Sequence, residues 1–464
     1  MNKPARVVLA VVVAALLAGD VAGYRHATRS QYPSHWDARV ADLVKFVEGA
    51  RHLRYDHPVP VEFLSEAEYK KQNGTSPDQL SAADKRDLRT FEGEAHALGL
   101  LGRDVDLVKQ LNTLGSSGTL AYYDDQAEKV VVRGTKIDVA TRVTLAHELT
   151  HALQDQNFDI SRKFSTDGAN SFFDALIEGD AVRIENQYVD SLSRSEQNEY
   201  YREDDAERSK AQDELAGVPP SLLQLFGAPY DLGEPLTRFV VEQQGVAGLN
   251  KLFRHPADSD EGLLDALAAT SGEHRQKVAV PALQPGETRT DKGDFGVVPW
   301  YVVLSSFVDQ PTALAAVDGW GGDSYVGYRK NNRPCIRIAF QGDTPNDNAE
   351  MTNALNQWKA AFTENTVQVV AMANGVQLDA CEPNVVPTPR ADAANSMELP
   401  ATRLELLDVF VQSNVPAKTA DCMARHIVTT IPLDKLNSDS NADQQQLFNI
   451  GQQIGRACAS GQLS

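Results

Sequence analysis

The chain is 464 residues long, with 42% hydrophobic and 23% charged residues, which is typical of a globular protein of two or three domains and excludes a disordered chain. Its formal net charge of −20 would repel a phosphate backbone, and no local basic patch interrupts the acidic sequence. We therefore expect no nucleic-acid partner.

The first 23 residues have the pattern of an export signal. Lys3 and Arg6 form a basic segment, residues 7–19 are apolar, and the small residues at 21–23 provide a cleavage site. The apolar run is short for a membrane span, and an uncleaved membrane anchor through residues 7–19 is the alternative. The sequence predicts a secreted or cell-envelope protein, with membrane attachment only if the signal is retained.

All four cysteines, Cys335, Cys381, Cys422 and Cys458, follow this signal, and an exported chain can oxidise them. Their spacing predicts two local disulfides, one joining Cys335 to Cys381 and one joining Cys422 to Cys458. Other connectivities and buried free thiols stay open at this level.

Before the central motif, the patterns predict an amphipathic helix over 36–49, a strand over 58–64 and a polar helical region over 65–101. Residues 119–123 and 128–133 flank an Asp-Asp-Gln turn and predict a hairpin. A strand beside a cleft can pair with an extended substrate chain. A hairpin that only covers the next helix is the alternative.

Residues 144–154 contain the pattern His-Glu-x-x-His, formed by His147, Glu148 and His151. Asp138 can cap a helix here, apolar residues recur at helical spacing from Val139 to Leu153, and no glycine or proline interrupts before Phe158. In a helix the two histidines stand one turn apart on one face and can bind a single zinc ion, with Glu148 beside them as general base. This pattern indicates a metallopeptidase, and the alternative is a chance match.

A second helix is predicted from near Asn170. A catalytic zinc needs a third protein ligand and one open position for water, and a carboxylate on a second helix supplies that ligand in His₂Glu sites. Glu178 is the candidate, and Glu185, two turns further on the same face, is its rival. Gly179 lets another backbone or the substrate come close to this helix. Ordinary surface acids are the alternative.

The sequence His-Glu-Leu-Thr-His-Ala-Leu-Gln-Asp at 147–155, followed by Leu-Ile-Glu-Gly-Asp-Ala at 176–181, resembles the zincin metallopeptidases on the gluzincin side. More narrowly, it resembles a group of exported bacterial proteins that carry this pair of motifs. The resemblance implies Zn²⁺ as the cofactor, a polypeptide as the substrate, His147, His151 and Glu178 as metal ligands, and Glu148 as the catalytic base.

The chain departs from two related patterns. Gln154 and Asn157 occupy the places where metzincins have glycine and histidine, so that family is excluded. Val182 stands where a thermolysin-like second motif has aspartate. We expect a ligand histidine to be oriented instead by Asp180, Asp174 or another group.

Further along the chain, residues 193–214 are highly charged and predict a solvated helix or a mobile excursion, and residues 222–253 predict an apolar helical segment. Tyr230 could donate a hydrogen bond to an oxyanion at the metal, and a tyrosine packed beneath a loop is the alternative. His255 and His274 are weaker candidates for the same role.

The remaining patterns predict a helix over 295–317, strands at 325–329 and 335–340, a helix over 346–362, a strand pair over 367–381 and helices from 404 to the end. The expected fold class is α+β. It comprises a mainly helical, zincin-like domain over 30–320 with a small sheet beside the motif helix, a small α+β unit over 321–385, a linker over 386–400 and a C-terminal helical unit over 401–464.

The sequence therefore predicts an exported zinc-dependent peptidase that hydrolyses peptide bonds through a zinc-activated water, with Glu148 as general base. The alternatives are a non-catalytic cell-envelope or binding protein on a zincin scaffold and a metal-dependent cell-wall amidase.

Overall fold

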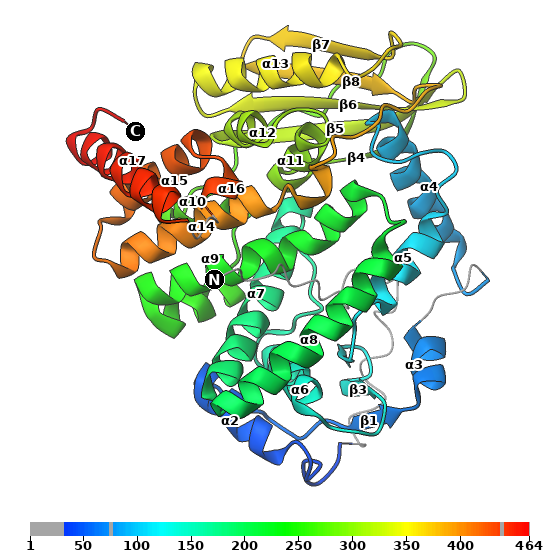
Figure 1. The fold of residues 1–464 in the computed structure, drawn as a ribbon. Helices are drawn as coiled ribbons and strands as arrows, with labels where there is room; N and C mark the ends of the chain where they lie inside the picture. Colours follow the sequence, from blue (N-terminus) through cyan, green and yellow to red (C-terminus); the bar gives the residue numbers. More distant parts are fainter. Residues whose placement is uncertain (1–31, 74–77, 437–439, 464) are drawn as a thin grey trace.

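The computed structural model describes residues 32–73, 78–436 and 440–463. Its architecture is mainly helical, with one small and one larger sheet, which confirms the α+β fold class (Figure 1). The export signal predicted over 1–23 lies outside the described residues. Within the described ranges, no helix has the length and apolar character needed to cross a membrane.

The N-terminal part builds the small sheet. Its elements are α2 (Ala41–Arg51), β1 (Val61–Leu64), α3 (Glu66–Asn73), α4 (Ala82–Ala97), α5 (Leu107–Ser116), β2 (Ala121–Asp124) and β3 (Lys129–Arg133). The strand order is β1-β3-β2, with β1 parallel and β2 antiparallel to β3, so the predicted hairpin is confirmed. Strand β2 lies at an edge of this sheet, next to the helix that contains His147, Glu148 and His151.

Four long helices follow: α6 (Val139–Phe158), α7 (Asp167–Ser191), α8 (Arg194–Leu215) and α9 (Pro220–Arg254). Asp138 caps α6 through its side chain, as predicted. The charged segment after α7 is a helix rather than an irregular excursion, and α9 kinks at Gly245, whose φ is 67°.

Helices α7 and α9 approach so closely that a side chain would not fit between them. A Cβ atom added to Gly179 would lie 2.1 Å from the carbonyl carbon of Gly233, and one added to Gly233 would lie 2.2 Å from the carbonyl oxygen of Ala175. The prediction that Gly179 admits another backbone is therefore confirmed, and that backbone belongs to α9.

The larger sheet and its helices form the next layer. Their elements are η1 (Glu261–Leu263), α10 (Ala266–Ser271), β4 (Glu287–Gly293), α11 (Val297–Ser305), α12 (Gln310–Val317), β5 (Trp320–Lys330), β6 (Arg333–Gly342), α13 (Pro345–Lys359), β7 (Val367–Met372) and β8 (Gly375–Cys381). The strand order is β4-β5-β6-β8-β7, and every pairing is antiparallel. Helices α11, α12 and α13 contact one another beside this sheet, and α13 lies against β6, β7 and β8 (Figure 1).

Two features of this region differ from the sequence prediction. The single helix expected over 295–317 is two helices, because Asp309 begins a new helix by capping α12, with Pro311 in its first turn. Strand β4 was not predicted, since its sequence Glu-Thr-Arg-Thr-Asp-Lys-Gly has no apolar alternation and most of it is exposed.

The C-terminal elements are η2 (Ala393–Asn395), α14 (Glu398–Gln412), α15 (Ala417–Thr430), α16 (Leu433–Leu436) and α17 (Asn441–Ser460). One apolar core runs from α7 and α9 through the larger sheet to α14 and α15. Both predicted disulfides are confirmed: Cys335 is joined to Cys381 between β6 and β8, and Cys422 to Cys458 between α15 and α17. The predicted domain boundaries stay a prediction.

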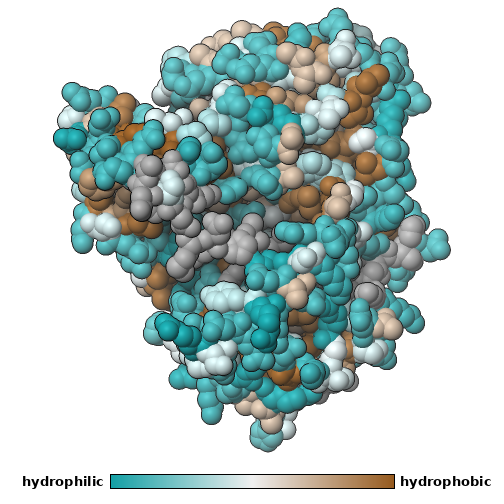
Figure 2. Space-filling view, in the orientation of Figure 1, coloured by the Kyte–Doolittle hydropathy of each residue, from teal (hydrophilic) through white to brown (hydrophobic). Residues whose placement is uncertain are grey.

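The surface matches the acidic composition. The face in Figure 2 is largely hydrophilic, with hydrophobic residues scattered over it. Scattered apolar side chains of this kind are normal for a globular protein.

Candidate metal centre

Three buried side chains from α6 and α7 bring their ligand atoms together. The Nε2 atoms of His147 and His151 lie 3.3 and 3.4 Å from Oε2 of Glu178, and all three groups offer an atom within 4.8 Å of the others. The two histidines are one helical turn apart, so their rings stand on one face of α6 with centroids 4.6 Å apart. The structure thus brings together the three residues that the sequence predicted as metal ligands.

The chemistry of this cluster fits a metal ion. Both carboxylate oxygens of Glu178 are buried, and among the described residues neither has a hydrogen-bond partner. A buried carboxylate without a hydrogen bond is costly, whereas a cation held between it and two imidazoles would satisfy all three groups. Two histidine nitrogens and one carboxylate are also the donor set of catalytic His₂Glu sites.

The outer nitrogen of each histidine has its own acceptor. His147 Nδ1 lies 3.1 Å from Glu185 Oε2, and His151 Nδ1 lies 3.1 Å from Gln154 Oε1. A proton held on Nδ1 by these oxygens leaves Nε2 as the lone-pair donor facing Glu178. Glu185, the rival third ligand, therefore lies at the far side of the His147 ring.

Asp180 supports this arrangement through Gln154. The amide nitrogen of Gln154 donates to Asp180 Oδ2 at 3.0 Å, while Arg51 and Arg183 contact the same carboxylate at 2.5 and 2.7 Å. Burial raises the pKa of Asp180, but the two arginines outweigh it and hold the pKa below its usual value. Gln154 therefore links Asp180 to His151 by hydrogen bonds. This role of Gln154 was not predicted from the sequence.

The cluster is electrostatically suited to positive charge. Burial opposes protonation of His147, but the carboxylates of Glu178 and Glu185 outweigh it and raise the pKa of His147 to about 10. Burial likewise opposes ionisation of Glu178, yet the two histidines lower its pKa to about 2. The carboxylates therefore favour a cation between α6 and α7, whether a proton or a metal ion.

Glu148 lies next to His147 and is held by the edge strand. Its Oε2 accepts a hydrogen bond from the backbone N–H of Tyr123 in β2 at 2.8 Å, while its Oε1 has no partner among the residues that the structure describes. The phenol of Tyr123 in turn donates to Asp155 at 2.9 Å, which fastens β2 along α6. Burial is the main cause that raises the pKa of Glu148, so its carboxylate is more basic than an exposed one.

Tyr69 of α3 is a second side chain that the sequence analysis missed. It is 1% exposed, and its hydroxyl has no hydrogen-bond partner within the described part of the chain. Burial raises its pKa, and the charge of Glu148 adds to that effect, so Tyr69 lies near the base. Nothing in the sequence connects it to Glu148, because the two residues belong to distant segments of the chain.

The other proposed oxyanion donors lie on α9 or after it. Tyr230 is a buried residue of α9, and the exposed side chain of His274 lies 3.3 Å from Asp258. His255 ends α9 at its C-terminal cap. A role for any of these three stays a prediction.

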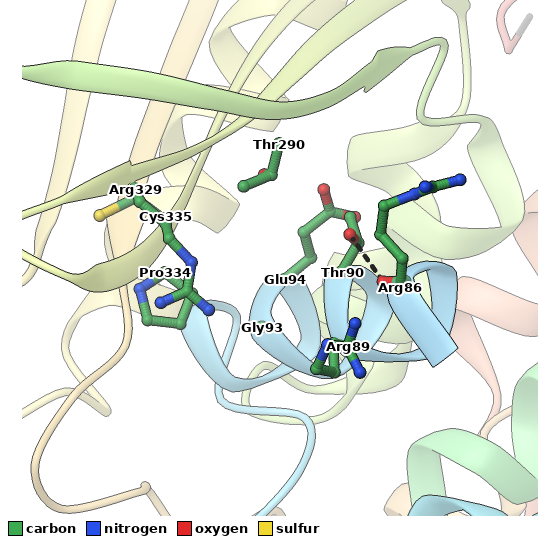
Figure 3. A pocket seen from close by; sticks show the side chains of 9 residues that line it. All are labelled: Arg86, Arg89, Thr90, Gly93, Glu94, Thr290, Arg329, Pro334 and Cys335. Carbon is green, nitrogen blue, oxygen red and sulfur yellow. Dashed lines mark hydrogen bonds between the residues drawn. The ribbon is translucent and has the colours of Figure 1, made fainter. Parts of the chain in front are cut away.

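A cavity of about 170 Å³ between α4 and the larger sheet contains none of the predicted site residues. Glu94 and the side chains of Arg86, Arg89 and Arg329 line it, and Figure 3 shows Glu94 pointing toward Thr290. Burial raises the pKa of Glu94 to about 8, with Asp291 and Asp167 adding to the effect. Because none of His147, His151 and Glu178 lines it, this cavity is separate from the candidate metal centre.

Comparison with protein-family models, curated proteins and solved structures gave no match for this chain. The functional argument therefore rests on the chemistry of the site and not on a fold-level likeness.

Proposed function

We propose that this chain is an exported zinc metallopeptidase of the zincin type, on the gluzincin side. The observation that carries the proposal is the meeting of two histidine Nε2 atoms from α6 with the Glu178 carboxylate from α7, all within 4.8 Å. The motif resemblance supports the same assignment. The two disulfides are consistent with an extracytoplasmic location.

In this proposal His147, His151 and Glu178 hold the zinc. Bound zinc would supply a Lewis acid that polarises a peptide carbonyl and makes a water molecule more acidic. Glu148 takes a proton from the attacking water through its unpaired Oε1 and passes it to the leaving amine. The N–H of Tyr123 fixes the other carboxylate oxygen, so that Glu148 keeps one orientation.

The presence of Glu148 favours an enzyme over a structural zinc site. Structural sites are usually closed by four protein ligands and have no need of an adjacent base. Here three candidate ligands lie together, and the neighbouring Glu148 has a buried carboxylate with one unpaired oxygen.

One observation favours a non-catalytic scaffold as the second candidate. As whole residues, His147, Glu148, His151 and Glu178 are at most 3% exposed in this conformation. A peptide can reach them only if the segments that cover them move apart. The two candidates therefore differ in whether Glu148 has a chemical role.

The substitution Glu148→Gln tests this difference, because it keeps the size of the side chain and removes the base. At matched zinc content, we expect cleavage of a mixed peptide library to fall by about 10²- to 10⁴-fold while zinc stays bound. Glu214→Gln, at an exposed position of α8, is the matched control and should cleave like wild type. Zinc-loaded wild type that cleaves nothing, together with a Glu148→Gln variant that fully complements a deletion strain, would favour the scaffold.

A further inference from the structure

A second cluster of ligand-type side chains lies apart from the histidine site. Glu261 begins η1, Glu273 follows α10, and Asp343 follows β6. Their carboxylate oxygens lie within 4.8 Å of one another. The cluster therefore joins the loop after α9 to the turn between β6 and α13.

Glu261 is the member of the cluster that calls for a ligand. It is 8% exposed, and the charges that act on its carboxylate are those of Glu273, Asp265, Asp343 and Asp260, with no hydrogen-bond donor or cation among them. Asp265, whose charge acts on Glu261, is paired with Arg425 at 2.7 Å, and Arg425 also contacts Asp318 and Asp421. A buried carboxylate that faces two other carboxylates is costly unless a positive charge lies between them.

The opposite side of the cluster is held in place by its neighbours. Gln276 donates through its amide to Asp343 Oδ1 at 3.0 Å, and its backbone N–H donates to the carbonyl of Gly321 at 2.6 Å. A Cβ atom on Gly322 would lie 2.4 Å from the carbonyl oxygen of Gln276, so the glycines at the start of β5 allow this close approach. Asp343 is thus oriented before any ligand arrives.

We propose that Glu261, Glu273 and Asp343 bind a divalent cation of the calcium class. Three carboxylates without histidine or cysteine form a hard, all-oxygen donor set, which suits calcium rather than zinc. Two oxygens that bind one calcium ion at about 2.3–2.6 Å can be at most about 5 Å apart, which the separation within this cluster satisfies. Water would complete the coordination, because two of the three residues are exposed.

Bound calcium would stabilise the segment that supports the start of α7. The hydroxyl of Thr166, the N-cap of α7, donates to the carbonyl of Asp258 at 3.0 Å. Gly168 lies against the backbone of Asp260, and a Cβ atom there would be 3.0 Å from its nitrogen. The cation would therefore hold the segment around Glu261, which contacts α7, against the end of β6 in the larger sheet.

The alternative occupant is a proton. Burial raises the pKa of Glu261 to about 9, and the charges of Glu273 and Asp265 add to that effect. A protonated Glu261 would need no metal ion. The calcium and proton alternatives differ in whether added calcium binds to the chain and raises its Tm.

The test uses the full chain, stripped of metal, reloaded with one equivalent of zinc and then titrated with CaCl₂ or MgCl₂. We expect calorimetry to detect one calcium site with a Kd of roughly 10⁻⁴–10⁻³ M, and Tm to rise by roughly 1–4 °C at saturating calcium. Glu273→Gln and Asp343→Asn should each weaken calcium binding at least about tenfold, while Glu214→Gln keeps it.

No calcium-dependent heat or Tm shift in wild type would overturn the proposal in favour of the proton. An unchanged calcium response in both Glu273→Gln and Asp343→Asn would overturn it as well, since the ion would then lie elsewhere. Both substitutions are at exposed positions, so they decide the question even if Glu261→Gln does not fold. Because zinc is constant throughout, the outcome is independent of the proposed peptidase site.

Discussion

Helices α7 and α11 are both largely buried, but their interiors are filled by different kinds of side chain. Every buried residue of α11 is uncharged, and its sequence Val-Val-Pro-Trp-Tyr-Val-Val-Leu-Ser is almost wholly apolar. Helix α7 buries Glu178, Asp180, Arg183 and Glu185 among its apolar residues. Apolar burial stabilises a fold directly, whereas buried charge is favourable only when every charge has a partner.

The difference indicates that the sequence of α7 is shaped by the site rather than by packing alone. Each of its buried charges is connected to the candidate metal ligands. Glu178 faces the two histidines and Glu185 meets His147, while Asp180, which pairs with Arg183, is linked to His151 through Gln154. We therefore expect α7 to tolerate loss of a charge much less well than the surface helices do.

The largest effect should come from Asp180→Asn, which removes the negative charge between Arg51 and Arg183. Arg51 is fully buried, with 0% of its side chain exposed, so its charge would be left without compensation. We expect the free energy of unfolding in urea to fall by about 3–5 kcal/mol.

The control is Asp205→Asn on α8, where the partner Arg208 lies 2.6 Å away and 72% of the Asp205 side chain is exposed. Loss of this pair should change stability by at most about 1 kcal/mol. Similar losses in both variants would show that α7 and α8 do not differ in the way the comparison requires.

A smaller effect is expected where α7 meets α9. Gly179→Ala places a Cβ atom 2.1 Å from the backbone of Gly233, so one helix must shift and stability should fall by about 1–3 kcal/mol. Gly49→Ala in α2 is the matched control, because no atom lies within 4 Å of its added Cβ. That substitution should stabilise the protein by about 0.5–1 kcal/mol through helix propensity, as measured by thermal unfolding. Equal effects of both substitutions would contradict the close α7–α9 contact.

The features that the sequence predicted are local ones. His147, Glu148 and His151 lie within two turns of one helix whose cap, Asp138, was also readable, and the cysteine spacing correctly paired all four thiols. Periodicity and spacing encode such features within a short window. The existence and order of most elements followed from the same signals.

The features that were missed depend on contacts between distant segments. Arg51 and Asp180 are 129 residues apart, and Tyr69 approaches Glu148 only through the packing of α3 beside the small sheet. Whether Glu178 or Glu185 is the third candidate ligand also depends on contacts between distant segments. Both stand on one face of α7, and the packing of α7 on α6 decides which of them meets Nε2 of His147 and which meets Nδ1.

Metal analysis combined with zinc-edge anomalous diffraction tests the central claim most directly. We predict about one zinc per chain, with the anomalous peak between His147 Nε2, His151 Nε2 and the Glu178 carboxylate. His151→Ala should lose the metal, and Glu178→Gln should weaken zinc binding far more than Glu185→Gln does. Equal zinc content in wild type and His151→Ala, or a peak away from these three side chains, would contradict the account.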